Sequence, residues 1–181
     1  MDSNHIMCIY GTHEGQLIHA LHFLKDGFRN NESCIFITNY LTEERIEIIL
    51  NDILSESNSE ISKASGDIKI VSAIDWFFKG QSQGQGQTKV NQEDVINSYA
   101  ELSNIALRSG KNTLRAFVDM SIFFKYDLVL DLLESESKLQ RIPNFPLKLI
   151  CGYLESDISL LSAKSYQQLQ TDHRHVYLIP D

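Results

Sequence analysis

The segment from Gly11 to Leu17 lies between a short apolar run and an amphipathic pattern, which is the setting of a phosphate-binding loop. Such a loop needs Gly-x4-Gly-Lys-Ser/Thr, because backbone amides cradle the phosphate, the lysine neutralises it and the hydroxyl holds magnesium. Here the loop is one residue short, with Gln16 in the lysine position, Leu17 in the hydroxyl position and an opposing charge at Glu14. We therefore expect no nucleotide hydrolysis and no enzymatic activity. The segment is then either an ordinary strand-to-helix turn or a helix N-terminus whose free amides bind a small polar ligand.

A second polar position, Asp119, ends the apolar run from Leu114 to Val118. An acid at this place holds magnesium in nucleotide-binding proteins, and ligands of open α/β sheets bind outside the carboxyl ends of the strands. Asp119 therefore either orients a ligand or only caps the helix that begins near Ser121. On the first interpretation, the residues expected to gather around a small pocket are Tyr10, Gly11, Thr12, His13, Asp119, Met120, Ser121 and Tyr153.

The six histidines and three cysteines raise the question of a metal. His19 and His22 have a spacing that can chelate on one helix, but the apolar stripe of that helix favours surface histidines. His5 would meet Cys8 or Cys151 if the first and fifth strands were neighbours, so His5 and Cys151 are the metal candidates we retain. The cysteines lie in apolar runs without Cys-x-x-Cys spacing, which favours buried, reduced thiols. We otherwise expect no metal and no cofactor.

Apolar runs alternate with helical patterns along the chain. Runs of this kind predict strands at 5–10, 33–38, 67–71, 114–118, 147–151 and 175–179. Helices are expected at 17–28, from a cap at Thr42 to about 54, from a cap at Asn91 to Gly110, at about 123–139 and at about 156–170. Buried strands with helices between them imply a mostly parallel sheet covered on both faces. The expected fold is a three-layer α/β/α domain of about six strands.

The composition fits one domain over residues 1–181, with 43% hydrophobic residues and a net charge of −8. The acidic balance, without any Lys/Arg cluster, argues against direct nucleic-acid binding. No apolar run is long enough for a membrane span and no signal peptide is evident, so we expect a cytoplasmic protein without membrane association. The polar run Gly80 to Gln87 predicts a mobile surface loop at 80–90.

Several short segments, taken in order, resemble a known family. A histidine and a strand ending in tyrosine (5–10) precede Phe-Leu-Lys-Asp-Gly-Phe (23–28), a second strand (31–38) and Asp-Trp-Phe-Phe-Lys-Gly (75–80). Arg-Ala-Phe-Val-Asp-Met-Ser (115–121), Cys-Gly-Tyr (151–153) and His-Arg-His (173–175) follow. This order, from His5 to Ile179, resembles the MEDS domain, the DcmR-like sensory domain. Asn31 and Leu154 depart from the family pattern.

The resemblance implies a RecA-like core related to KaiC-type ATPases but without a working phosphate loop. It also implies a non-catalytic module of prokaryotic signal transduction or transcriptional regulation that senses a small organic molecule at the carboxyl edge of the sheet. The partner that receives the signal would be a separate output protein, a kinase or a DNA-binding regulator. The alternative is an interaction subunit, a pseudo-ATPase that pairs with itself as a homodimer or with a RecA/KaiC-like partner.

Overall fold

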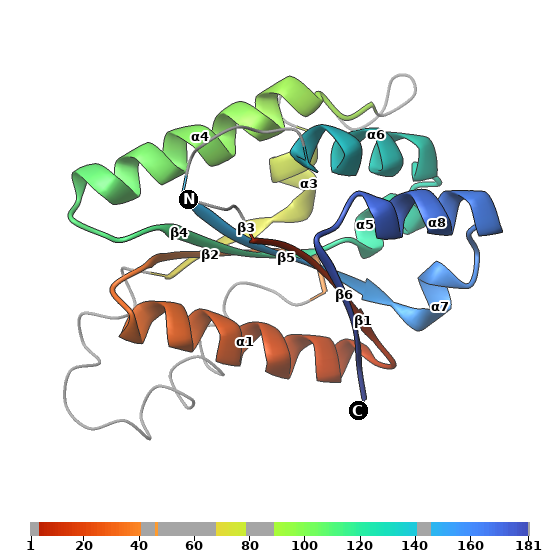
Figure 1. Ribbon diagram of the computed structural model, residues 1–181, viewed down its shortest axis with the longest axis horizontal. Helices are drawn as coiled ribbons and strands as arrows, with labels where there is room; N and C mark the ends of the chain where they lie inside the picture. The colour runs from red at the N-terminus through yellow and green to blue at the C-terminus, as the bar shows by residue number, and fades with distance from the viewer. Residues whose placement is uncertain (1–3, 41–45, 47–67, 79–88, 141–145, 181) are drawn as a thin grey trace.

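The computed structural model describes residues 4–40, 46, 68–78, 89–140 and 146–180, and these form one parallel sheet with helices on both faces (Figure 1). The strand order is β3-β2-β4-β5-β1-β6. The strands are β1 (Asn4–Tyr10), β2 (Ser33–Thr38), β3 (Ile68–Ser72), β4 (Leu114–Asp119), β5 (Leu147–Leu154) and β6 (His175–Ile179). All pairs are parallel, which confirms the expected α/β fold and number of strands.

The helices divide unevenly between the two faces of the sheet. They are α1 (His13–Arg29), α3 (Ala73–Phe77), α4 (Gln92–Arg108), α5 (Ser121–Lys125), α6 (Val129–Gln140), α7 (Glu155–Ile158) and α8 (Ala163–Thr171). Figure 1 shows α1 on one face and α3, α4, α6 and α8 on the other. Alternate strand residues follow this division, since Cys8 and Tyr10 of β1 pack with α1 whereas Met7 and Ile9 belong to the opposite core. None of the helices in the described residues is long and apolar enough to cross a membrane.

Two predicted helices are each interrupted. The helix expected at 123–139 is divided into α5 and α6, because Asp127 adopts a positive φ of 54° that ends a right-handed helix. The helix expected at 156–170 is divided into α7 and α8, and Ser162 caps the second piece by accepting from the Ser165 amide. Asn91 caps α4 and Gly110 follows its end with φ 76°, both as predicted.

Two predictions fall on segments that the structure does not describe. The stripe of the helix expected at 42–54 lies outside the described residues apart from Ile46, which is buried in the core beneath α1. Most of the loop expected at 80–90 also lies outside them, and its described end, Val90, is buried.

A buried ion-pair network lies near the amino ends of the strands on the α1 face. The carboxylate of Glu32, 3% exposed, pairs with both Arg115 and Lys148. Arg115 also donates to the Phe23 carbonyl at 2.9 Å and lies 4.5 Å from the Phe23 ring centroid. Gly27 makes room for this side chain, because a Cβ there would lie 2.5 Å from Arg115 Cδ. The glycine of the 23–28 segment is therefore a packing requirement of the network.

We expect Gly27→Ala to destabilise the fold by about 1–3 kcal/mol, because the added methyl overpacks against Arg115 and against Cys34 Sγ at 2.7 Å. Urea unfolding followed by circular dichroism measures this. The matched control is His22→Ala on the exposed face of the same helix, which should change stability by less than about 0.5 kcal/mol. Equal midpoints for the two variants would contradict the packing argument.

We expect Glu32→Ala to cost about 3–5 kcal/mol, because it leaves the buried Arg115 guanidinium without its counter-charge. The control is Glu134→Ala, which removes a carboxylate from the exposed Glu134–Lys138 pair and should leave the unfolding midpoint unchanged. Chemical denaturation of both variants tests this. A small loss at Glu32, comparable to that at Glu134, is the opposing result.

Candidate functional site

The loop after β1 caps α1 and turns one side chain into the sheet. Thr12 is the N-cap residue, and its hydroxyl accepts a hydrogen bond from the Gly15 amide at 3.1 Å. Gln16 is 3% exposed, and its Nε2 atom would lie 2.7 Å from a Cβ at Gly152. The side chain in the lysine position of a phosphate loop thus lies against β5, whereas Gly11 and Thr12 remain exposed.

Asp119 has both carboxylate oxygens bound within the protein. Oδ1 accepts from the Ser121 amide at 3.1 Å and Oδ2 accepts from the Thr38 hydroxyl at 3.0 Å. The adjacent Met120 is buried, and its amide donates to the Gly152 carbonyl. Asp119 therefore accepts from the first amide of α5, whose N-cap residue is Met120, and ties β4 to β2. Burial raises the pKa of Asp157, and Asp119 lies close enough to that side chain to raise it further.

The carboxyl edge gathers polar atoms that lack partners among the described residues. His13 Nδ1, Asn39 Nδ2 and Asp157 Oδ2 are buried atoms without a hydrogen bond. Asp157 lies near Asp119, and burial followed by that like charge raises the pKa of Asp157, partly offset by nearby His13. We call His13, Asn39, Asp119 and Asp157 the carboxyl-edge group. The chain leaves β1 toward α1 and leaves β5 toward α7, so the group lies where connections diverge to opposite faces, the usual ligand position in open α/β sheets.

An aromatic ring borders this group. The rings of His13 and Tyr40 stack with centroids 4.1 Å apart and an angle of 12° between their planes, and Tyr40 is 46% exposed. Asn39 is held by the Ser72 hydroxyl, which donates to its Oδ1 at 2.9 Å. The edge thus presents an aromatic face beside hydrogen-bonding groups.

The structure separates two tyrosines that the sequence placed in the same pocket. Tyr10 packs on the α1 face, where its hydroxyl is hydrogen-bonded to His19 Nδ1. Tyr153 points to the opposite face, and its hydroxyl donates to Glu136 Oε1 at 2.7 Å. Both are at most 1% exposed. The predicted residues that lie together at the edge are therefore those around His13 and Asp119, and Tyr10 and Tyr153 belong to the two cores.

A buried cluster of His5, Glu136, Cys151 and His173 lies beneath α6 and α8. His5 Nε2 is 2.9 Å from Glu136 Oε2 and 3.4 Å from Cys151 Sγ. His173 Nε2 is 3.3 Å from the same Glu136 oxygen, and the two imidazole centroids are 4.2 Å apart. One donor atom from each of the four residues lies within 4.8 Å of the others. We call these four residues the buried quartet.

Burial and the mutual charges of Glu136 and the two histidines set the pKa values in the buried quartet. Burial alone would raise the pKa of Glu136, but His173 and His5 outweigh it and hold that pKa well below its usual range. Burial lowers the pKa of His173, and the Glu136 carboxylate more than reverses this, so the pKa of His173 is raised. Burial, followed by the charge of Glu136, raises the pKa of the Cys151 thiol well above its usual value. A positive charge, from a proton or a cation, is therefore favoured between these side chains.

The metal candidates retained from the sequence, His5 and Cys151, are thus brought together through neighbouring strands β1 and β5. Cys8, the alternative partner predicted for His5, lies on the other face of the sheet. All three cysteines are buried, and none of them forms a disulfide. His19 is turned toward Tyr10 instead of forming a chelating pair with the exposed His22.

Glu136 was not predicted as a site residue from the sequence, although its spacing from two leucines indicates a buried position. Glu136 follows Leu132 by four residues and Leu133 by three, so it falls on the buried face of α6. A charged residue on an apolar helix face indicates a paired or ligating group. Asn39, Tyr40 and Asp157 were also not predicted as site residues. Asn39 and Tyr40 follow β2 outside any helix or strand, and Asp157 lies in the four-residue helix α7, which is too short to show a periodicity.

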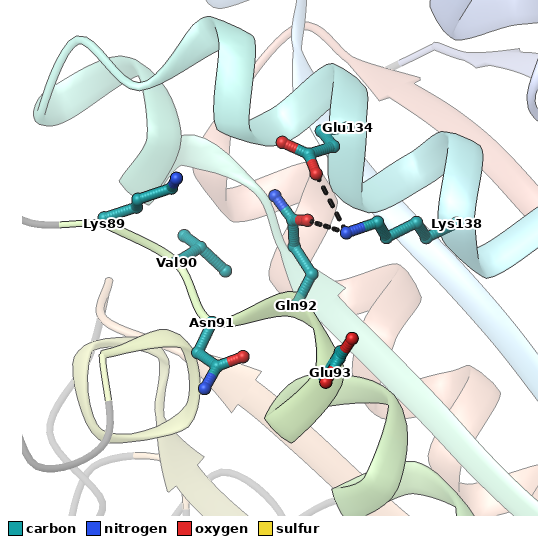
Figure 2. A pocket seen from close by; sticks show the side chains of 7 residues that line it. All are labelled: Lys89, Val90, Asn91, Gln92, Glu93, Glu134 and Lys138. Carbon is teal, nitrogen blue, oxygen red and sulfur yellow. Dashed lines mark hydrogen bonds and ion pairs between the residues drawn. The ribbon is translucent and has the colours of Figure 1, made fainter.

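A surface hollow of about 360 Å³ lies elsewhere, between α6 and the segment that leads into α4 (Figure 2). Lys138 crosses it, binding Glu134 Oε1 at 2.9 Å and the Gln92 side-chain oxygen at 2.6 Å. Its lining is mostly charged and amide side chains, with Val90 and Gln92 buried, and it contains the Glu134–Lys138 ion pair. None of the residues predicted for ligand binding lines it.

Comparisons with known proteins agree with this fold. A search of curated proteins found no significant match. A KaiC-like protein of the hyperthermophilic archaeon Pyrococcus horikoshii has a similar structure, with a TM-score of 0.58, 14% sequence identity, and coverage of 98% of this chain and 71% of that chain. This neighbour supports the expected RecA-like core. The family model of MEDS, described as the methanogen/methylotroph, DcmR sensory domain, matches residues 4–171, and the chain therefore belongs to the MEDS family.

Proposed function

We propose that this MEDS domain is a non-catalytic sensory module that binds a small organic molecule at the carboxyl-edge group. The observation that carries the proposal is the set of unpartnered atoms, His13 Nδ1, Asn39 Nδ2 and Asp157 Oδ2, at one edge of the sheet. Buried polar groups are normally hydrogen-bonded, so three unsatisfied atoms beside an exposed aromatic ring favour a ligand that completes them.

The chemistry of the group argues for the class of ligand. Asp119 and Asp157 lie close together, so an anion such as phosphate would be repelled. Gln16 is buried against β5 and offers no charge to neutralise a phosphate. A neutral or cationic molecule that donates to Asp157 Oδ2, accepts from Asn39 Nδ2 and packs on the Tyr40 ring fits these groups better than a nucleotide. A small alcohol, or an amine that also carries an acceptor, has these properties. Binding would then be reported to a separate output protein.

We expect small alcohols or amines to raise the Tm of the protein, and Mg-ATP and inorganic phosphate to leave it unchanged. A thermal-shift screen followed by calorimetric titration measures this. His13→Ala should weaken binding of any hit by at least about tenfold, since it removes both a hydrogen-bonding atom and the stacked ring. His22→Ala is the matched control and should bind normally. Stabilisation by Mg-ATP together with phosphate release would contradict the proposal.

We also expect Asp157→Asn to raise the Tm of the ligand-free protein at neutral pH while weakening ligand binding. The folded protein raises the pKa of Asp157, so the ionised side chain is less favourable in the folded state than in the unfolded chain. The gain should be small, because the side chain is partly exposed, and should disappear as the pH falls below the ordinary aspartate pKa of 3.8. Asp26→Asn, at an exposed position of α1, is the control. A lower Tm for Asp157→Asn at pH 7 would oppose this account.

A second candidate function, self-association, is favoured by the β6 edge. Leu178 is 74% exposed and Tyr177 48% exposed on an edge strand that pairs only with β1 among the described residues. Apolar edge strands invite pairing with another chain. If this edge mediates dimerisation, light scattering should show a dimer that Leu178→Lys converts to a monomer. Leu130→Lys, at an exposed position of α6, should leave the dimer intact. A monomeric wild-type protein would rule this function out.

A further inference from the structure

We propose that the buried quartet, His5, Glu136, Cys151 and His173, is a tetrahedral zinc site. It stands independently of the ligand-binding proposal, because none of its residues belongs to the carboxyl-edge group. All four side chains are buried, with Glu136 fully so. Two imidazoles, a thiol and a carboxylate form a donor set that zinc accepts, and structural zinc sites take four protein ligands.

The spacing of the donor atoms suits this geometry. Zinc–nitrogen distances near 2.0–2.1 Å and zinc–sulfur distances near 2.3 Å place tetrahedral ligands roughly 3.3–3.6 Å apart. The distances from His5 Nε2 to Cys151 Sγ and from His173 Nε2 to Glu136 Oε2 are 3.4 and 3.3 Å. The distance from His5 Nε2 to Glu136 Oε2 is shorter, 2.9 Å. Since the four donor atoms lie within 4.8 Å of one another, binding one ion would require side-chain rotations that bring the widest pairs closer.

Two hydrogen bonds orient His173 and Glu136 toward the centre of the quartet, whereas His5 Nδ1 has no hydrogen bond among the described residues. His173 Nδ1 lies 2.7 Å from the Leu169 carbonyl, which can only accept, so Nδ1 carries the hydrogen and Nε2 faces Glu136. Metal-bound histidines are usually held in this way, and their carboxylate co-ligands are hydrogen-bonded in turn. Tyr153 supplies that bond by donating to Glu136 Oε1, which leaves Oε2 for the ion.

The unsatisfied atoms point to a cation. Glu136 Oε2 and His173 Nε2 face each other 3.3 Å apart as buried atoms that lack a hydrogen bond of good geometry among the described residues, with His5 Nε2 2.9 Å from the same Glu136 oxygen. When His173 is neutral, both are acceptors, and their lone pairs repel unless a positive charge lies between them. A zinc ion with one thiolate, one carboxylate and two neutral imidazoles is electrically balanced, which a buried site requires.

The ion would join four separate elements. His5 comes from β1, Cys151 from β5, Glu136 from α6 and His173 from the turn between α8 and β6. Figure 1 shows α6 and α8 beside one another on the same face of the sheet. Binding transfers the Cys151 thiol proton, and any proton held by the histidines, to the solvent as the metal–sulfur bond forms. The metal would therefore fasten both helices to the central strands.

Cobalt(II), a spectroscopic substitute for zinc, tests the proposal on the full chain after treatment with a chelator. We expect one cobalt per chain, tetrahedral ligand-field bands and a thiolate-to-cobalt charge-transfer band. Zinc should displace cobalt from the loaded protein. Added to the metal-free protein, zinc should release protons and raise the Tm by roughly 5–10 °C at a hundredfold excess over its Kd. A folded protein that takes up neither metal, or that binds cobalt without the thiolate band, would overturn the proposal.

Substitutions assign the ligands. Cys151→Ser should abolish the charge-transfer band, and Glu136→Gln should weaken zinc binding by more than about tenfold. Tyr153→Phe tests the positioning hydrogen bond and should weaken it by roughly 10–100-fold. The double variant Cys8→Ser/Cys34→Ser keeps only Cys151 and must retain the full band, so the test holds even if Cys151→Ser does not fold. Loss of the band in that double variant would refute the assignment.

Two further controls separate this proposal from the others. Asp157→Asn, which should weaken binding of a small organic ligand, must leave the cobalt spectrum unchanged. His22→Ala must also bind one cobalt with the same spectrum, because surface histidines of α1 lie outside the quartet. A change of spectrum in His22→Ala would count against the buried site.

Discussion

The parallel pairing of β1 with both β5 and β6 is the constraint on which the rest of the structure depends. The register places Met7 opposite Cys151 and Ile6 opposite His175. Because β6 begins there, the residues just before it pass over the start of β1, and the Arg174 amide donates to the His5 carbonyl at 3.0 Å. The register thereby determines both that His5 meets Cys151 and that the His173 ring lies against the His5 ring, tilted by 39° with centroids 4.2 Å apart.

The strands could be predicted from the sequence but their order could not. Each strand is an apolar run that can be recognised from its own residues. The order of the strands in the sheet depends instead on which helices cover which face. For that reason the meeting of His5 with Cys151 could be stated only as a condition, and Glu136 was left out although its spacing from Leu132 was readable. The break at Asp127 is a backbone conformation that helical periodicity does not report.

The glutamine at position 16, where a phosphate loop has its lysine, has a structural counterpart. Gln16 fills space beside Gly152 and Phe117, and a Cβ at Gly152 would lie 2.8 Å from the Phe117 ring. The glycine of the Cys-Gly-Tyr segment therefore matches the inward glutamine. A lysine at position 16 would bury its charge in this contact unless it turned outward, so restoring the phosphate-loop residue alone would not restore the site.

The two candidate sites lie in regions that differ in their contacts: α6 and α8 are restrained at the buried quartet, whereas α7, beside the carboxyl-edge group, has few buried contacts. His173 and Glu136 anchor α8 and α6 at the buried quartet, which opposes movement of these helices. Asp157 lies in α7, a four-residue helix with no buried residues and no side-chain cap, followed by Leu160, which is 74% exposed. Local opening is easiest where buried contacts are few. On the proposed function, a ligand that binds Asp157 would first change the conformation of α7 and of Leu160, which follows it. An output protein would then contact this segment.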